Sequence, residues 1–286
     1  MSRDLPPGGA AGRKIEAAIR RANREGRPAI TAFITAGHPR KDRFADILRT
    51  VGSAADVVEV GVPFSDPMAD GVTIQRASRS ALQAGVTLPW ILDQLRRSPV
   101  PAPLLLMSYL NPLLAFGPAR LAVAAAEAGV QGFIVPDLPV EEADVLLPYL
   151  EPRNLGLVQF VTPVTPGHRI SDLCARSSGF VYAVTRTGTT GGSFDPAGAA
   201  DMLARVRSIS PLPVQAGFGV RGAEQVRALA PHVDGVIVGS ALVERLEAGE
   251  DPTSFLMSLR ASPAAGSMSA VKTPGVPMAD RHGEAR

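Results

Sequence analysis

Short apolar runs, rich in β-branched residues, recur along the chain and are separated by longer segments with helical spacing of apolar residues. A short run that is apolar throughout is typical of a strand buried on both faces. The alternation of such runs with helical segments predicts a parallel sheet covered by helices. The predicted strands cover residues 29–35, 57–62, 104–108, 132–135, 157–161, 180–184, 213–216 and 235–238.

The helical segments complete the pattern. The first, residues 14–25, precedes the first strand and places Ile15, Ala18, Ile19 and Ala22 on one face. Eight strand-and-helix units follow, which predict an α/β fold, a single (β/α)8 TIM barrel with an extra N-terminal helix. The further predicted helices cover residues 42–51, 73–84, 89–97, 118–128, 140–150, 168–176 and 224–229, and two more begin at Asp195 and Ser240.

Composition divides the chain into three parts. Residues 1–12 are rich in Gly and Pro and are predicted to be a mobile N-terminal segment. Residues 263–286 combine Gly, Pro, Ser and Ala without periodicity, which predicts a disordered C-terminal tail. Residues 13–262 form the predicted barrel and catalytic domain, a usual length for this fold.

Charge and hydropathy exclude several classes of protein. The 286 residues are 45% hydrophobic, ample for a buried core, and their net charge is only +2. The start lacks the apolar core of a signal peptide, and no apolar run reaches about 18 residues, so no membrane span is expected. Basic residues near the start have no interleaved aromatics and predict a solvated helix face rather than a nucleic-acid surface. They are Arg13, Lys14, Arg20, Arg21, Arg24 and Arg27.

Cysteine and histidine add little chemistry. The single cysteine, Cys174, can form no internal disulfide, so a reducing cytoplasm is expected, with Cys174 as buried filler. The four histidines are scattered without ligand spacing, so no metal site is predicted. His38 and His168 are expected to be exposed in loops, and Trp90 to serve packing.

A candidate active site begins with Glu59, which interrupts the valine-rich second strand. A carboxylate in such a run must be paired, protonated or functional, because burying an unpaired charge is costly. The following loop, broken by prolines and Gly71, carries Asp66 and Asp70. One carboxylate on a strand and one on the next loop can form a two-acid site at the end of a barrel. The alternative is a structural ion pair of Glu59 and two helix-capping aspartates.

A candidate phosphate site follows the seventh and eighth strands. Gly217 and Gly219 follow the seventh, and Gly239 and Ser240 follow the eighth. Glycines allow backbone N–H groups to approach an anion, and a helix N-terminus with Ser240 as its cap favours negative charge. Either loop alone is equally consistent with a simple strand end. Together, at the places where barrels often bind phosphate, they favour a phosphate site.

The loop after the sixth strand, residues 185–194, is long and rich in hydroxyl groups and glycine. Such a loop is typical of a lid over a small substrate. A flexible connector is the alternative that composition leaves open.

These motifs resemble the signature of the tryptophan synthase α chain family. The stretch Glu-Val-Gly-Val-Pro-Phe-Ser-Asp-Pro-Met-Ala-Asp-Gly at residues 59–71 carries most of the resemblance, which spans residues 14–247. It also includes residues 33–37, 137–142, 182–191, 217–219 and 239–240. There are two departures. The aromatic within residues 107–111 is placed differently, which affects the pocket wall after the third strand, and Gly191-Gly192 implies a looser lid.

The resemblance implies that Glu59 and Asp70 are the catalytic pair. It also implies that Phe33, Tyr182 and Phe218 surround the indole or glycerol group and that Thr190 meets the catalytic aspartate from the lid. By the same resemblance, the backbone N–H groups that bind the phosphate belong to Gly191, Gly219, Gly239 and Ser240. Pro63 and Asp66 lie where the family's second loop faces the β chain.

The implied reaction is retro-aldol cleavage of indole-3-glycerol phosphate to indole and glyceraldehyde 3-phosphate. A carboxyl of raised pKa such as Glu59 can move the protons, and an ionised Asp70 in a polar loop can stabilise charge on the indole. The resemblance implies no cofactor in this chain, and a β-chain partner carrying pyridoxal phosphate in an α2β2 heterotetramer. A free-standing lyase of a secondary pathway and a mainly regulatory subunit are the alternatives.

Overall fold

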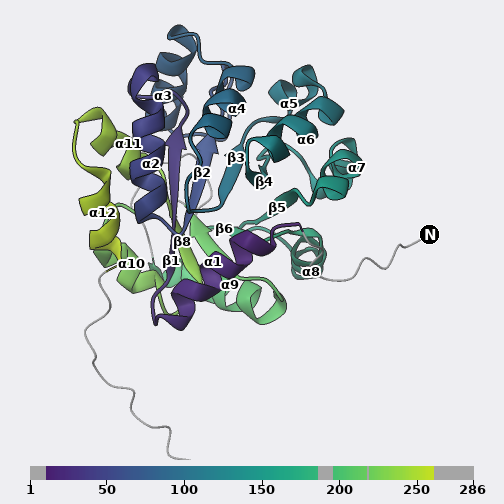
Figure 1. The fold of residues 1–286 in the computed structure, drawn as a ribbon. Helices are drawn as coiled ribbons and strands as arrows, with labels where there is room; N and C mark the ends of the chain where they lie inside the picture. The colour runs from purple at the N-terminus through teal and green to yellow at the C-terminus, as the bar shows by residue number, and fades with distance from the viewer. Residues whose placement is uncertain (1–10, 186–195, 218, 261–286) are drawn as a thin grey trace, which may run out of the picture.

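The computed structural model describes residues 11–185, 196–217 and 219–260. Within these ranges, eight parallel strands form a closed barrel in chain order, in which β8 pairs with β1. Helices surround the barrel (Figure 1), and the predicted (β/α)8 architecture is confirmed. The strands are β1 (Ala29–Thr35), β2 (Val57–Gly61), β3 (Leu104–Met107), β4 (Val130–Ile134), β5 (Gly156–Val161), β6 (Val181–Val184), β7 (Val214–Gly217) and β8 (Gly235–Val238).

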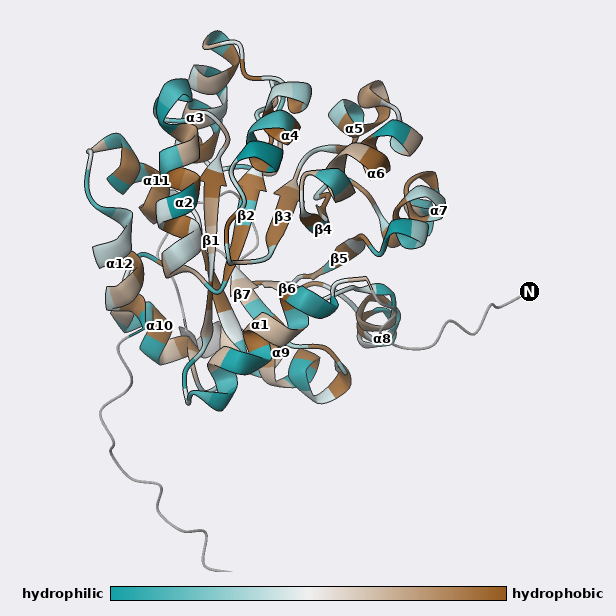
Figure 2. Cartoon of the chain, viewed as in Figure 1, coloured by the Kyte–Doolittle hydropathy of each residue, from teal (hydrophilic) through white to brown (hydrophobic). Residues whose placement is uncertain are grey.

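The strands are apolar on both faces because one face fills the barrel and the other meets the helices. All residues of β2 are buried, and strands β1 to β4 are apolar along most of their length (Figure 2). Val58 and Val60 belong to the core between barrel and helices, whereas Val57 belongs to the interior cluster. Glu59 shares the face of Val57 because side chains alternate along a strand. Its carboxyl group therefore points into the barrel.

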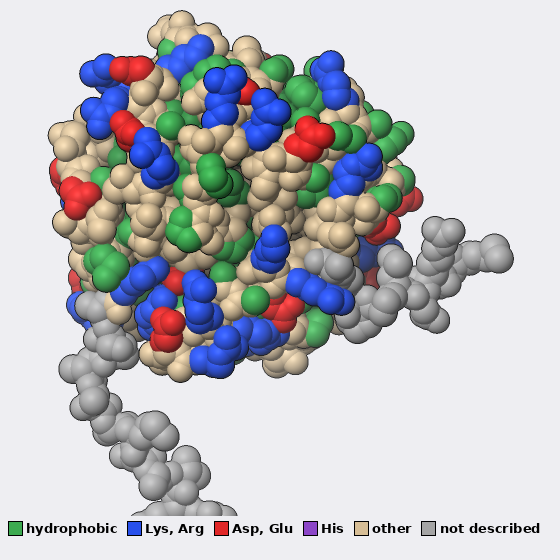
Figure 3. Space-filling model, viewed as in Figure 1, with side chains coloured by type: hydrophobic (Ala, Val, Ile, Leu, Met, Phe, Trp, Pro, Cys, Tyr) green, Lys and Arg blue, Asp and Glu red, His purple; other side chains and the backbone are tan. Residues whose placement is uncertain are grey.

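Helix α1 (Arg13–Arg24) closes the N-terminal end of the barrel. Its buried Ile15 and Ile19 form one cluster with Ala29 and Phe180, which lie near the starts of β1 and β6. The opposite face of α1 is exposed, as predicted, and Lys and Arg side chains gather at the surface over it (Figure 3). Lys14, Arg21 and Arg24 line an open groove there of about 620 Å³.

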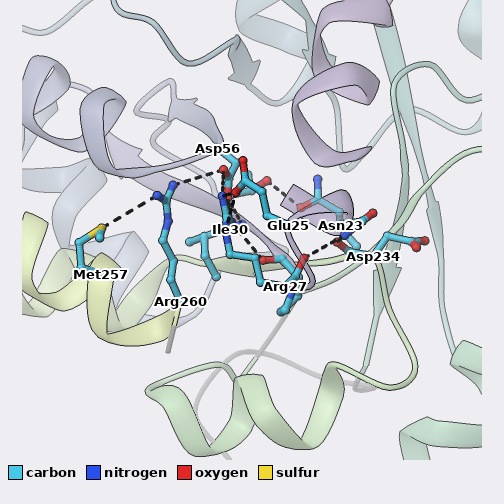
Figure 4. A network of polar contacts seen from close by, with 11 residues as sticks. Asn23, Glu25, Arg27, Ile30, Asp56, Asp234, Met257 and Arg260 are labelled. Carbon is cyan, nitrogen blue, oxygen red and sulfur yellow. Dashed lines mark hydrogen bonds and ion pairs between the residues drawn. The ribbon is translucent and has the colours of Figure 1, made fainter. Parts of the chain in front are cut away.

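Arg27 departs from the predicted solvated face, because it binds the buried carboxylate of Asp56 (Figure 4). Its two terminal nitrogens lie 2.7 and 2.9 Å from the two carboxylate oxygens. Asp56 also accepts the backbone N–H of Ile30 at 2.9 Å and a hydrogen bond from Arg260 at 3.2 Å. These contacts tie the start of β2 to β1 and to the end of the last helix.

The helices after α1 surround the barrel, and most of them lie where the sequence predicts a helix. They are α2 (Phe44–Ala54), α3 (Val72–Gln83), α4 (Leu88–Arg97), α5 (Leu110–Phe116), α6 (Pro118–Glu127), α7 (Leu147–Leu150), α8 (Gly167–Arg176), α9 (Pro196–Ile209), α10 (Ala223–Leu229), α11 (Ser240–Glu247) and α12 (Pro252–Leu259). The predicted boundaries at residues 1–12 and 263–286 fall largely outside the described residues.

Three segments differ from the prediction, each because of proline. The helix predicted over 140–150 is a 3-10 helix (Val140–Val145), the single turn of α7 and a second 3-10 helix (Glu151–Arg153). Pro148 prevents a continuous helix because it lacks an N–H group and clashes with the preceding turn. Helices α5 and α12 were not predicted separately. Pro112 and Pro252 fall in their first turns, where no N–H partner is needed, and Asp251 caps α12 through Thr253 and Ser254.

Among the described residues, no helix is long and apolar enough to cross a membrane.

Candidate active site

Glu59 lies in the barrel interior among apolar side chains. The strand register sets it beside Phe33 of β1 and Leu105 of β3. Its side chain is about 1% exposed, and its Oε2 has no hydrogen-bond partner among the described residues. Burial, together with the nearby charge of Asp70, raises the pKa of Glu59 from its ordinary value of 4.5 to about 8. Among the described residues Glu59 forms no ion pair, and with a pKa of about 8 it is mainly protonated at neutral pH.

Asp70 lies in the loop between β2 and α3 and is half-buried. Burial raises its pKa from 3.8 to about 6, and a hydrogen bond from the Tyr109 hydroxyl lowers it in part. The loop is thus less polar than the sequence implied, although Asp70 is still mainly ionised at neutral pH. Its charge contributes to the raised pKa of Glu59, as expected for two carboxyl groups near each other.

Tyr109 lies after β3, where the sequence left the pocket wall unassigned. Its ring is buried and stacks on Phe64, with ring centroids 5.2 Å apart. Its hydroxyl accepts the backbone N–H of Ala69 at 2.9 Å, next to the carboxyl group of Asp70. Tyr109 therefore holds the Asp70 loop against β3. In the sequence, the one feature that could have identified Tyr109 as a site residue is its place as an aromatic residue just after a barrel strand.

Two predicted pocket residues, Phe33 and Tyr182, line the barrel interior above Glu59. A Cβ on Gly61 would lie 2.5 Å from the Phe33 ring, and a Cβ on Gly217 would lie 2.3 Å from the Tyr182 ring. Glycine is required at both strand ends because each ring lies across its neighbour's backbone. Burial, and then the charges of Glu59 and Asp70, raise the pKa of the Tyr182 phenol, which places it near both acids.

The predicted phosphate loops lie on neighbouring strands at the same end of the barrel. Gly219, with φ of 93°, follows β7, and Gly239 is the N-cap of α11 after β8. Ser240 is the first residue of α11 and not its cap, so the prediction that its hydroxyl caps the helix is wrong. Its backbone N–H is one of the free donors at the helix start, where the helix dipole favours an anion.

The other predicted site residues lie outside the described residues or at the edge of the site. Thr190, Gly191 and Phe218 lie outside the described residues, as does the predicted lid after Thr185. Pro63 is buried, so its side chain is not available to a partner at the surface of this chain. Asp66 is exposed, and the apolar side chains of Met68 and Val72 beside it are each 74% exposed.

Of the remaining predictions, those for Cys174 and Trp90 are confirmed and that for His38 is wrong. Cys174 is buried, as predicted, and Trp90 packs against Phe44 with ring centroids 5.5 Å apart. His168 is exposed but lies in α8, while His38 is buried, contrary to prediction, with Nε2 2.9 Å from a Glu247 oxygen. Across the described ranges, no group of three or more His, Cys, Asp or Glu side chains could hold a metal ion.

The site therefore combines two carboxyl groups of different pKa with aromatic walls and, across the barrel mouth, two glycine-containing loops. Between about pH 6 and pH 8 the pair holds one proton, on Glu59, and one negative charge, on Asp70. Such a pair can donate a proton at one place and stabilise positive charge at another.

Known proteins show the same combination of sequence and fold. A profile of the family described as tryptophan synthase alpha chain matches residues 19–271. The tryptophan synthase alpha chain of Nitratidesulfovibrio vulgaris is 46% identical over 247 residues, which cover 85% of this chain and 96% of the relative. A structure of Mycobacterium tuberculosis tryptophan synthase superposes with a TM-score of 0.76 at 34% identity, covering 87% of this chain and 94% of that chain. A tryptophan synthase complex from Pyrococcus furiosus superposes with a TM-score of 0.72 at 32% identity, covering 81% and 97%.

Proposed function

Because the chain belongs to the tryptophan synthase α chain family, we propose that it acts in L-tryptophan biosynthesis as the lyase that cleaves indole-3-glycerol phosphate to indole and glyceraldehyde 3-phosphate. The observation that carries the proposal is the difference in pKa between the two carboxyl groups, which is about 8 for Glu59 and about 6 for Asp70. A retro-aldol cleavage of this substrate needs one proton donor and one fixed negative charge, and this pair supplies both near neutral pH.

Glu59 moves the protons. In its neutral form it protonates carbon 3 of the indole ring, and the resulting carboxylate accepts the proton of the hydroxyl on the adjacent side-chain carbon. The bond between that carbon and carbon 3 then breaks, its electrons return to the ring, and the carbon becomes the aldehyde of glyceraldehyde 3-phosphate. Glu59 ends the cycle protonated, as it began.

Asp70 stabilises the ring while carbon 3 is protonated, because positive charge then lies on the indole N–H. An ionised carboxylate in a half-buried loop interacts more strongly with that charge than it would in water. Phe33 and Tyr182 are proposed to hold the flat ring. Gly219, Gly239 and Ser240 are proposed to bind the phosphate and so orient the reacting bond. From the family resemblance, Phe218 is proposed to surround the indole or glycerol group, Gly191 to bind the phosphate, and Thr190 to meet Asp70 from the lid.

The proposed partner is a tryptophan synthase β chain in an α2β2 assembly, with pyridoxal phosphate bound to the β chain and no cofactor in this one. The exposed Asp66, Met68 and Val72 form a surface beside the catalytic loop that suits such a contact. A cytoplasmic location stays a prediction from cysteine content.

The test is indole release from indole-3-glycerol phosphate by the purified chain, with and without a tryptophan synthase β chain. We expect slow release by the chain alone and strong acceleration in the mixture. Fast release that the β chain does not change indicates a free-standing lyase. Release by neither sample, with the chain folded by circular dichroism, contradicts the proposed reaction.

A further inference from the structure

Helix α3, which follows the catalytic loop, packs directly on α11, which begins at the phosphate loop (Figure 1). Ile74 and Ala77 of α3 form a small buried cluster with Val243 of α11 and Phe33 of β1. This cluster is separate from the main core. The helix behind Asp70 therefore lies on the helix behind Gly239, with a pocket residue between them.

Two carboxylates of α11 bind polar side chains of α3 beside this cluster. Glu244 Oε1 accepts a hydrogen bond from the Thr73 hydroxyl at 3.0 Å. One turn further, Glu247 accepts hydrogen bonds from Arg76, one of them at 3.1 Å. Thr73 and Arg76 are likewise one turn apart on α3, so the two helices are joined in register.

Glu244 has a second partner, Arg221, which binds its Oε2. Arg221 lies two residues after Gly219 in the loop that follows β7. Glu244 itself lies one turn inside the helix that starts at Gly239 and Ser240. The carboxylate of Glu244, on α11 after the β8 loop, thus contacts both the loop after β7 and the first turn of α3.

The first turn of α3 is joined in turn to the backbone of Asp70. The Gln75 side-chain amide donates to the Asp70 carbonyl oxygen at 2.9 Å, and the Gln75 N–H donates to the Gly71 carbonyl oxygen at 2.9 Å. A shift of Thr73 would therefore be carried to Asp70, because only two residues separate them and Gln75, in the same turn, is hydrogen-bonded to Asp70 and Gly71.

We propose that Glu244 is a positioning residue that couples phosphate binding to the placement of Asp70. A phosphate bound at Gly219, Gly239 and Ser240 fixes the β7 loop and the start of α11. Because Glu244 binds both Arg221 and Thr73, fixing these elements also fixes the first turn of α3 and, with it, the loop that carries Asp70. The inference rests on the proposed function for its catalytic consequence, but the mechanical link can be measured without turnover.

The catalytic test compares Thr73→Val, Glu244→Gln and their double variant with the wild-type chain. We expect kcat for indole release to fall about tenfold in each, because small displacements of a catalytic group reduce rates by one to two orders of magnitude. The dissociation constant for glycerol 3-phosphate should change less than about twofold, since the backbone donors stay. The double variant should be no slower than the slower single variant, because both substitutions remove the same hydrogen bond between Thr73 and Glu244.

Two control variants separate positioning from general damage. Thr73→Ser keeps the hydroxyl and should restore most of the kcat lost in Thr73→Val. Glu250→Gln removes a carboxylate that pairs with Arg245 near the end of α11, away from α3, and should leave kcat unchanged. A Thr73→Ser variant as slow as Thr73→Val, or equal losses of kcat and of glycerol 3-phosphate affinity, overturns the proposal.

Hydrogen–deuterium exchange supplies the readout that needs no turnover. Glycerol 3-phosphate should slow amide exchange over residues 72–76 in the wild-type chain and in Glu250→Gln, but not in Glu244→Gln. If the wild-type chain releases no indole yet shows this protection, the proposed reaction fails and the coupling stands. If glycerol 3-phosphate gives no protection of α3 in the wild-type chain, or gives equal protection in Glu244→Gln, the coupling is wrong.

Discussion

Asp56 lies directly before β2 and Glu59 lies in its middle, three residues further on, and each is about 1% exposed. Burial acts on both in the same direction, since it raises the pKa of any carboxyl group. At Asp56 this effect is outweighed by hydrogen bonds from Arg27 and Ile30 and by the charge of Arg260, so its pKa is lowered. At Glu59 no cation among the described residues opposes it, and the charge of Asp70 adds to it.

Burial alone therefore does not say what a carboxyl group does in this barrel. Asp56, whose oxygens are bound by Arg27, Arg260 and the Ile30 N–H, keeps its negative charge and ties the start of β2 to β1 and to the end of α12. Glu59, with an oxygen that has no partner among the described residues, can gain and lose a proton near neutral pH. The hydrogen-bond and ion-pair partners of each carboxyl group, and not its burial, distinguish the structural Asp56 from the reactive Glu59.

The largest expected effect follows from removing the proton of Glu59. Glu59→Gln keeps shape and burial but can neither donate nor accept the transferred proton. We expect kcat for indole release to fall by at least about 100-fold, within the usual range for general acid–base residues. Asp56→Asn is the matched control and should retain the activity of the wild-type chain per folded molecule. Retained activity in Glu59→Gln with a large loss of stability would show that Glu59 is structural.

The second prediction concerns stability, for which the two acids should give opposite signs. The folded pKa of Glu59 is raised, so the unfolded chain releases this proton first, and stability is lost as pH rises from 4.5 to about 8. At about 1.4 kcal/mol per pH unit the loss is at most about 5 kcal/mol. Glu59→Gln removes this loss. Its free energy of unfolding should therefore exceed that of the wild-type chain, by a margin that grows up to pH 8 and is then constant.

Asp56 should show the reverse. Its folded pKa is lowered, so its stabilisation is present above the unfolded value of 3.8 and is lost only as pH falls through the folded pKa. Asp56→Asn removes the buried carboxylate that binds Arg27 and Arg260, leaves Arg27 only the exposed Glu25 as an acidic partner, and should reduce the free energy of unfolding by about 3 kcal/mol. The reduction should be nearly the same from pH 6 to pH 9. Urea unfolding of both variants at several pH values checks both signs, and two losses of the same sign would remove the distinction.

The same two acids show how far sequence could reach. The barrel and the importance of Glu59 followed from local signals: apolar runs, their alternation with helices, and a carboxylate inside a valine run. The raised pKa of Glu59 was anticipated because the strand is apolar throughout. Its true surroundings were not, since the adjacent valines face the helices and the contacts in the barrel are Phe33 and Leu105, which are distant in sequence.

What sequence could not supply was the identity of partners across the fold. Nothing near Asp56 marked Arg27 or Arg260 as its partners, and Arg27 was grouped with a solvated basic face. His38 was expected in solvent but is buried against Glu247, a contact 209 residues apart in the chain. Tyr109 was noticed only as an unusual aromatic, because its role depends on Phe64 and Asp70 being folded back onto β3.

The smallest expected effect concerns Tyr109, whose hydroxyl donates a hydrogen bond that lowers the pKa of Asp70. The proposed reaction needs Asp70 ionised and Glu59 protonated, so kcat/KM should follow a bell-shaped pH profile with limbs near pH 6 and pH 8 that belong to the coupled pair. Tyr109→Phe keeps the ring on Phe64 but removes the hydroxyl that favours ionised Asp70. The acidic limb should therefore move to higher pH, by about one unit or less. The alkaline limb should stay, because Asp70 is fully ionised there in both proteins. Tyr149→Phe, at an exposed tyrosine of α7, is the matched control and should change neither limb. An acidic limb that stays in place in Tyr109→Phe, or that moves to lower pH, would mean that Asp70 does not set it.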